Sequence, residues 1–183
     1  MELKSERLIY REYQEQDLPL FYSVFSDEQV MKYALIDRYL SVEEILPFFH
    51  EVLENNRMKE NRRNYELAVY LEEDQRFIGF ADIEIQMKNS TGGCGEVGYF
   101  LLPQYWGKGY ATEIANTLVE YCFRDIGLHR VTARCNANNR SSEHIMIKTG
   151  MRLEGEFRKV RFKNGRWENE KHYSILAEEW KQK

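Results

Sequence analysis

Hydrophobic residues recur at helical spacing in two segments of the chain, and helix-start signals mark two more. The strongest pattern covers residues 111–126, where apolar side chains follow every third or fourth position before Gly127, so we expect a long amphipathic helix ending at this glycine. Ser41 opens a capping-box pattern before a second helix, which Pro47 is expected to kink or delay. The other two helical segments are residues 17–25 and 139–150.

Runs rich in β-branched and aromatic residues predict seven strands, at residues 7–13, 65–71, 76–85, 95–102, 130–135, 151–162 and 167–176. An acidic turn over residues 72–75 and the Asn164-Gly165 pair predict two antiparallel hairpins. The polar segment 88–93 is expected to be a loop. The element order β, helices, β, β, β, α, β, α, β, β predicts an α/β (α+β) fold, in which helices pack on a mixed sheet.

The composition is that of one globular domain. The chain has 183 residues, 43% hydrophobic and 31% charged, and no linker or repeat divides it, so we expect a single domain over residues 1–183. Its 26 Lys and Arg against 30 Asp and Glu give a net charge of −4, which makes a dedicated nucleic-acid binder unlikely on electrostatic grounds. No apolar run reaches the roughly 18 residues of a membrane span, and the start has no signal-peptide pattern, so we expect a cytoplasmic protein.

The cysteines show no spacing typical of metal binding. Cys94, Cys122 and Cys135 form no C-x-x-C pair, and the four histidines are dispersed along the chain. We therefore expect reduced thiols that act as small core residues, and no metal site.

A glycine-containing turn joins a predicted strand to the long helix. Residues 101–112 read LLPQYWGKGYAT, with glycines at positions 107 and 109. Such a turn exposes backbone N–H groups at a helix N-terminus, where the unpaired donors and the helix dipole favour an anion such as a pyrophosphate. A tight turn whose glycines only relieve steric strain is the alternative, and it is the better explanation for two glycines taken alone. The segment is neither a Walker A loop nor a dinucleotide-binding fingerprint.

Several motifs together resemble one enzyme family. YWGKGYATE at residues 105–113 looks like the coenzyme A loop of the GNAT N-acetyltransferases, in the branch of the ribosomal-protein-alanine N-acetyltransferases. EVGYFLLP at residues 96–103 resembles the strand before that loop, and NRSS followed by KTGM resembles the family's N-x-x-S…K-x-G-[FM] segment. The resemblance implies a GNAT fold, with a mixed, largely antiparallel sheet opened at the acyl-CoA site and helices on both faces. It also implies an N-acetyltransferase that uses acetyl-CoA as co-substrate.

The resemblance assigns coenzyme A binding to the strand before the loop, to the loop and to the following helix. The loop amides are implied to hold the pyrophosphate, and one strand amide is implied to polarise the thioester carbonyl. Trp106 stands where the general family carries Gln or Arg. The residues implied to bind the cofactor are Phe100, Leu101, Leu102, Trp106, Gly107, Lys108, Gly109, Tyr110, Ala111, Thr112, Asn139 and Ser142.

Two residues are candidates for proton transfer. Glu96, on the strand before the loop, is our candidate for the base that deprotonates the amine; a surface or salt-bridged glutamate is the alternative, and Glu84 is a weaker candidate. Ser142 is implied to donate a hydrogen bond to the leaving thiolate, with helix capping as its alternative role. Gly98 either permits close approach of the cofactor or marks a β-bulge.

The sequence leaves the amine acceptor open. The resemblance favours the α-amine of a protein or peptide, and an α-amine with a pKa of about 8 is more often neutral at pH 7 than a lysine at about 10.4. A small amine of the polyamine or aminoglycoside type, or a non-catalytic module that binds acyl-CoA, are the alternatives. Arg161 and Asn169 stand where relatives offer acids, which weakens the substrate assignment.

Basic residues gather near the closing hairpin. We expect a solvated strand surface there, with an acidic protein, rRNA or the 3′-phosphate of coenzyme A as alternative partners. The sequence does not specify an oligomeric state. The basic residues are Arg158, Lys159, Arg161, Lys163 and Arg166.

Overall fold

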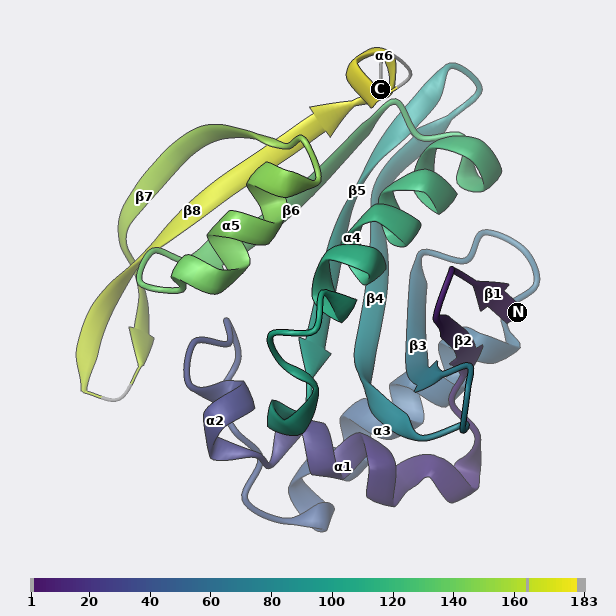
Figure 1. Cartoon of the computed structure of the whole chain (residues 1–183), viewed down its shortest axis with the longest axis vertical. Coiled ribbons are helices and arrows are strands. Elements are labelled where there is room, and N and C mark those ends of the chain that lie inside the picture. The colour runs from purple at the N-terminus through teal and green to yellow at the C-terminus, as the bar shows by residue number, and fades with distance from the viewer. Residues whose placement is uncertain (1, 164, 181–183) are drawn as a thin grey trace.

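The computed structural model describes residues 2–163 and 165–180, whose strands form one sheet of eight (Figure 1). Every neighbouring pair of strands is antiparallel except β5 and β6, which are parallel. This confirms the predicted mixed, largely antiparallel sheet. In spatial order the strands are β1 (Glu2–Lys4), β2 (Leu8–Glu12), β3 (Asn64–Leu71), β4 (Phe77–Asn89), β5 (Gly92–Leu101), β6 (Arg130–Asn136), β8 (Arg166–Leu176) and β7 (Arg152–Lys163).

Helices cover both faces of the sheet, as Figure 1 shows, and enclose two hydrophobic cores. Strand β3 shows how the sequence achieves this: Leu67 and Val69 pack in the core beneath α4, while Ala68 and Tyr70 pack in the core beneath α1 and α3. A strand buried on both faces has a continuous apolar run. The helices are α1 (Leu18–Phe25), α2 (Glu28–Met31), α3 (Val42–Arg57), α4 (Tyr110–Tyr121), α5 (Arg140–Lys148) and α6 (Ala177–Trp180).

Strands β5 and β6 pair over a short distance and then separate. Their parallel ladder joins Cys94 to Arg130, and it ends where Glu96 pairs with Thr132. Strand β5 stays paired with β4 as far as Leu101, whereas β6 continues alongside β8 (Figure 1). The sheet is therefore open between β5 and β6 beyond Glu96.

The helix that follows Ser41 begins where the capping pattern predicts. The Ser41 hydroxyl accepts the N–H of Glu44 at 3.3 Å, and the Glu44 carboxylate accepts the N–H of Leu40 at 2.7 Å. Helix α3 then runs through Pro47 without interruption. The expected delay at Pro47 is wrong, because a proline removes a single backbone donor and the buried face of the helix compensates for that loss.

The expected loop over residues 88–93 is also wrong. Strands β4 and β5 remain paired up to Asn89 and Gly92, so only two residues form the turn. The side chain of Asn89 accepts the N–H of Thr91 at 2.9 Å, which stabilises this tight connection. Gly93 is a strand residue: a Cβ placed there would lie 2.3 Å from the Met87 carbonyl oxygen. This glycine allows close strand contact, a role that composition alone could not separate from a loop.

Most other predicted boundaries agree with the structure. The long helix continues from α4 through a π-helical turn, Cys122–Ile126, and ends at Gly127, which has a φ of 78°. Strand β1 and the short helices α2 and α6 were not predicted, because segments of three or four residues carry too little periodicity. Residue 164 of the predicted Asn-Gly turn lies outside the described residues, but Lys163 pairs with Arg166 as the hairpin requires.

Lys163 anchors the β7–β8 hairpin to the segment after α2. Its Nζ donates to the backbone carbonyls of Met31, Ala34 and Ile36, each at 2.8 Å, and the residue is 6% exposed. Burial lowers the pKa of its ammonium group. The expectation of a solvated basic surface is therefore wrong for Lys163, because its charge is satisfied by three carbonyl dipoles and not by water.

We expect Lys163→Met to destabilise the fold by about 1–3 kcal/mol, because three carbonyls lose their buried donor while the aliphatic stem is kept. Urea unfolding measures the effect. Lys159→Met is the matched control: it removes the same charge from an exposed side chain of the same strand and should change stability by less than about 0.5 kcal/mol. Equal stability of the two variants would show that the three contacts contribute nothing.

Candidate active site

The predicted coenzyme A loop connects β5 to α4. Residues Pro103–Tyr105 form a 3-10 turn, and Gly107 and Gly109 follow with left-handed φ values of 75° and 85°. Gly109 is the N-cap of α4 and has no side chain with which to cap the free N–H groups of the first helical turn. The predicted residues Tyr110, Ala111 and Thr112 occupy that turn. The geometry is that of a backbone anion site at a helix N-terminus.

Two side chains fix this loop. Arg7, in the turn between β1 and β2, donates to the Lys108 carbonyl at 3.1 Å and forms an ion pair with Glu113 of α4 at 2.7 Å. Trp106 donates its indole N–H to the Leu101 carbonyl at 2.7 Å. The tryptophan at the Gln or Arg position therefore ties the loop to the end of β5. Arg7 was not predicted as a site residue, because only the fold brings it to the loop.

Strand geometry determines which β5 amides face the opening. The Leu102 N–H donates to the Ile78 carbonyl at 2.9 Å, so it points toward β4. Since successive amides of a strand point to opposite edges, the Leu101 N–H points toward the β6 side. Of the predicted Phe100 to Leu102 backbone, Leu101 thus fits the role of polarising a thioester carbonyl. The Leu102 amide is already engaged.

The start of α5 lies on the α4 side of the sheet. Asn139 is the N-cap, and its side chain accepts the Ser142 N–H at 3.1 Å, so the capping role foreseen as the alternative is present. Tyr99 of β5 has a buried hydroxyl with no hydrogen-bond partner among the described residues. Burial raises the pKa of Tyr99 to about 12, and the Ser142 hydroxyl partly offsets that effect. Two hydroxyl groups therefore face this side of the opening.

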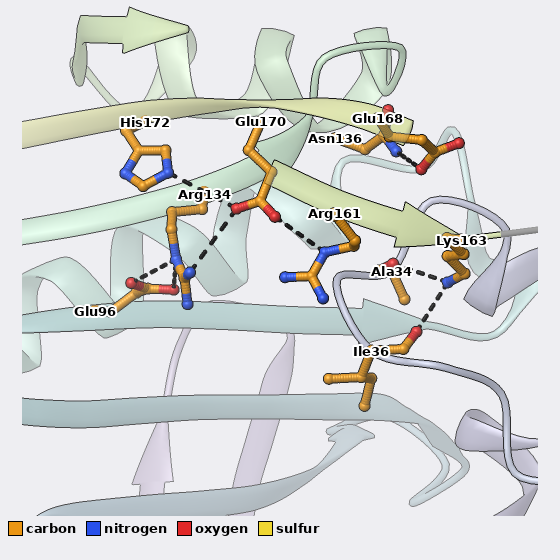
Figure 2. Close-up of polar contacts among 10 residues, drawn as sticks. All are labelled: Ala34, Ile36, Glu96, Arg134, Asn136, Arg161, Lys163, Glu168, Glu170 and His172. Atoms are coloured by element: carbon orange, nitrogen blue, oxygen red, sulfur yellow. Dashed lines mark hydrogen bonds and ion pairs between the residues drawn. The ribbon is translucent and has the colours of Figure 1, made fainter. Parts of the chain in front are cut away.

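Glu96 lies on the opposite face, in a chain of ion pairs that Figure 2 shows. Both of its carboxylate oxygens accept from the Arg134 Nε, at 2.7 and 2.9 Å. Arg134 also lies 3.8 Å from Glu170, which accepts from the Arg161 Nε at 2.9 Å and lies 3.7 Å from His172. The salt-bridged alternative for Glu96 therefore describes its state in the structure.

Two carboxyl groups on the same face escaped the sequence analysis: Glu66 is buried, and Asp82 is partly buried. Asp82 of β4 lies opposite Glu66 of β3 in the strand register. Burial raises the pKa of Asp82 to about 7, helped by the charges of Glu66, Glu96 and Glu84. Burial also raises the pKa of Glu66 to about 7, and one of its carboxyl oxygens is buried without a hydrogen-bond partner in the described residues. The available signal was alternation: both acids occupy positions in strands whose neighbouring residues are apolar.

Gly98 accommodates the carboxyl group of Asp82. The two residues are directly paired across β4 and β5, and a Cβ at position 98 would lie 2.5 Å from the nearer Asp82 oxygen. The only register shift between these strands falls between Ile85 and Met87, so the bulge alternative for Gly98 is wrong. The glycine is required because the carboxyl group fills the space that any side chain would need.

Arg166 and Asn169 of the hairpin have structural partners. Arg166 donates to Glu168 at 2.9 Å, and Asn136 donates to the same carboxylate (Figure 2). Asn169 accepts the N–H of Lys159 at 2.9 Å and donates to Glu156 at 2.6 Å. These bonds stabilise β7 where its register shifts between Phe157 and Arg161. Asn169 thus supports an irregular strand in this chain.

The cysteines are free, and two of them are buried. Burial raises the pKa of Cys122 to about 12 and that of Cys135 to about 11, so neither thiol is poised as a nucleophile. Within residues 2–163 and 165–180, no cluster of three His, Cys, Asp or Glu has metal-binding geometry. No helix among these residues is long and apolar enough to span a membrane.

The sequence matches the family model described as the acetyltransferase (GNAT) domain over residues 7–152. The uncharacterized N-acetyltransferase YnaD of Bacillus subtilis is 33% identical over 180 residues, which cover 98% of this chain and 99% of the relative. The spermidine N(1)-acetyltransferase of Vibrio cholerae is 25% identical over 178 residues, 96% of each chain.

Solved structures have the same fold. A GNAT-family acetyltransferase from Bacillus anthracis superposes with a TM-score of 0.78 at 30% identity, covering 97% of this chain and 99% of the other. Spermidine N-acetyltransferase from Vibrio cholerae, in complex with CoA and spermine, superposes with a TM-score of 0.82 at 20% identity, covering 96% and 99%. The sheet with an opening between two strands is therefore shared with enzymes of this fold.

We expect Gly109→Val to raise the acetyl-CoA dissociation constant at least tenfold, or ~1.4 kcal/mol, because valine is strained at a φ of 85° and displaces the loop amides. Calorimetry measures the affinity. Gly165→Val is the matched control, since residue 165 has a φ of 76° in open space at the far hairpin. A folded Gly109→Val protein with unchanged affinity would exclude the loop from cofactor binding.

Proposed function

Because the chain belongs to the GNAT acetyltransferase family, we propose that it transfers the acetyl group of acetyl-CoA to a primary amine of a small, multiply charged cation of the polyamine type. The observation that carries the acceptor class is a row of carboxyl groups on one face of the sheet. Glu66, Asp82, Glu84 and Glu96 come from three adjacent strands and share that face beside the β5–β6 opening.

The charge of this face suits a polycation better than a neutral amine. Arg134 is the cation that acts on Asp82, and it is already paired with Glu96 and Glu170. Arg62 acts on Glu66, and it is already paired with Glu12. Glu84 is exposed, and no ion pair engages it among the described residues. Placing a second ammonium group of the acceptor beside Glu84 would neutralise charges that now repel one another. The full-length similarity to spermidine acetyltransferase supports the same class.

The donor side of the proposal uses the opening and the loop. The amides at the start of α4 hold the pyrophosphate of coenzyme A, and the free edge of β5 pairs with the amide groups of its pantetheine arm. The thioester then lies between β5 and β6, with the Leu101 N–H directed at its carbonyl oxygen. The amine reaches the carbonyl carbon from the acidic face, while the sulfur faces Ser142 and Tyr99.

The reaction is a direct transfer. A neutral amine attacks the thioester carbonyl carbon, a C–N bond forms, and the oxyanion is stabilised by the backbone donor of β5. The C–S bond then breaks, and the coenzyme A thiolate takes a proton. A thiolate with a pKa near ~8.5 is a good leaving group, so a hydrogen bond from Ser142 or Tyr99 is sufficient assistance.

An acceptor panel tests the proposal. We expect spermidine to give the highest kcat/KM among spermidine, an aminoglycoside, an alanine tripeptide with a free α-amine, and the same peptide with a blocked N-terminus and a free lysine. Coenzyme A release, detected with a thiol reagent, measures the rate. A higher kcat/KM for the free tripeptide would replace the polyamine with a peptide α-amine as acceptor. No turnover with any amine would leave the non-catalytic module as the function.

We expect Glu84→Gln to raise the KM for spermidine about two- to fivefold at low ionic strength, with little change in kcat, because one exposed charge is removed from the binding face. The effect should shrink as salt is added. Glu73→Gln, in the exposed turn after β3, makes the same change in net charge and is expected to leave KM unaltered. Identical KM values for both variants would argue against an electrostatic role for this face.

A further inference from the structure

We propose that Asp82, with Glu66 beside it, accepts the proton from the incoming ammonium, and that Glu96 is a positioning residue. This inference rests on the proposed acetyl transfer but not on the choice of a polyamine as the acceptor. Glu96 was the candidate that the sequence offered, and the geometry favours Asp82 of β4 for three independent reasons.

The first reason is position along the strands. Glu66, Asp82 and Gly98 are in register across β3, β4 and β5. The ladder between β5 and β6 ends at Glu96 and Thr132, two residues before Gly98. The Asp82 carboxyl group therefore lies beside the part of β5 where the sheet is open, whereas Glu96 lies at the last residue pair where it is closed.

The second reason is the direction of the Asp82 carboxyl group. Gly98 carries no side chain, so nothing from that residue separates the Asp82 carboxyl group from the β5–β6 side of the sheet. The contact of 2.5 Å between an imagined Cβ at position 98 and an Asp82 oxygen shows how directly the carboxyl group faces this strand. Asp82 is partly exposed, so an amine approaching the opening can reach it.

The third reason is that Asp82 is uncommitted. Among the described residues, no hydrogen bond or ion pair engages its carboxyl group, whereas both Glu96 oxygens accept from Arg134. An acceptor for a proton needs an available lone pair on an atom that the donor can reach. Both Glu96 oxygens already accept from Arg134, so an amine at this carboxylate would have to share it with the guanidinium group, and Arg134 is itself held by Glu170.

The groups that surround Asp82 tune it for this role. Glu66 faces it from β3, Glu84 from its own strand, Glu96 from β5 and Arg134 from β6. Burial is the main cause that raises the pKa of Asp82 to about 7, and the three acids add to this effect against the one Arg134. Asn55 of α3 donates to Glu66 at 3.2 Å and leaves the other oxygen of that carboxyl group without a partner in the described residues. At neutral pH the pair is poised to take up one proton.

The proton balance is simple. The ammonium group gives its proton to the Asp82 carboxylate, and the nitrogen lone pair forms the C–N bond to the acetyl carbon. The C–S bond breaks, and the thiolate receives a separate proton on the other face of the sheet. Asp82 returns its proton to water once the product leaves, because the group is partly exposed.

The test is the pH dependence of Asp82→Asn. We expect kcat at pH 7 to fall roughly 10²-fold, the usual size of general-base assistance, and the acidic limb of the pH profile near 7 to disappear. Glu96→Gln is expected to keep that limb. The assay uses whichever of spermidine and the alanine tripeptide gives the higher kcat/KM, so failure of the polyamine proposal leaves this test intact. A limb lost in Glu96→Gln and kept in Asp82→Asn would overturn the inference. An Asp82→Asn variant in which KM rises while kcat is unchanged would overturn it too.

Stability separates a proton-transfer role from a structural one. The pKa of Asp82 is raised from 3.8 to about 7 by folding, so ionising it costs stability increasingly as pH rises through this range. The Tm of Asp82→Asn should therefore exceed that of the wild type, by a margin that grows from pH 4 to 7 and is then constant. A lower Tm would mean that the carboxyl group supports the fold.

Gly98→Ala is a second variant: its methyl group displaces the carboxyl group, so we expect a lower kcat with the acidic limb retained. Full activity in Gly98→Ala would contradict the proposal.

Discussion

Strands β5 and β6 exchange backbone contacts over three residue pairs and then part, and the arrangement of the rest of the molecule depends on this separation. Strand β4 keeps β5 in place, and β8 carries β6 away, so the opening is held from both sides. Backbone groups that a closed sheet would pair internally are left free to bind an extended ligand. The glycine loop follows at the end of β5, so the proposed phosphate-binding and amide-binding parts of the donor site lie in one line.

The two faces of this opening have different chemistry because a strand alternates its side chains. Tyr99 and Leu101 point toward α4 and α5, where Ser142 lies, whereas Glu96 and Gly98 point toward α1 and α3. Acids on one face and hydroxyl groups on the other suit a reaction in which the amine loses a proton and the thiolate gains one. In the proposed reaction this separation keeps the two proton transfers apart, so the group that takes a proton from the amine does not also protonate the thiolate.

Much of this architecture was readable from the sequence, since long periodic segments such as the α4 helix and the β3 run carry strong local signals. The predictions of a helix delay at Pro47 and of a loop that includes Gly93 were wrong for one reason. Each residue usually interrupts regular structure, but the surrounding contacts accommodate it here. At the site, the loop residues follow from their motif, but the Glu96–Arg134 pair joins residues 38 positions apart. This pair has no local sequence signal, and the apolar neighbours of Asp82 indicate a strand position but not its partners, so the roles of the acids depended on the structure.

Lys163 binds backbone carbonyls of residues 31–36, and not their side chains. Replacement of the exposed residues Lys32 and Ile36 can therefore change the surface of this segment without removing its anchor, whereas Met31 and Ala34 pack in the core. The segment lies against the tip of the β7–β8 hairpin (Figure 1). Such an attachment lets the exposed surface of this segment vary by point substitution while its position against the β7–β8 hairpin is kept.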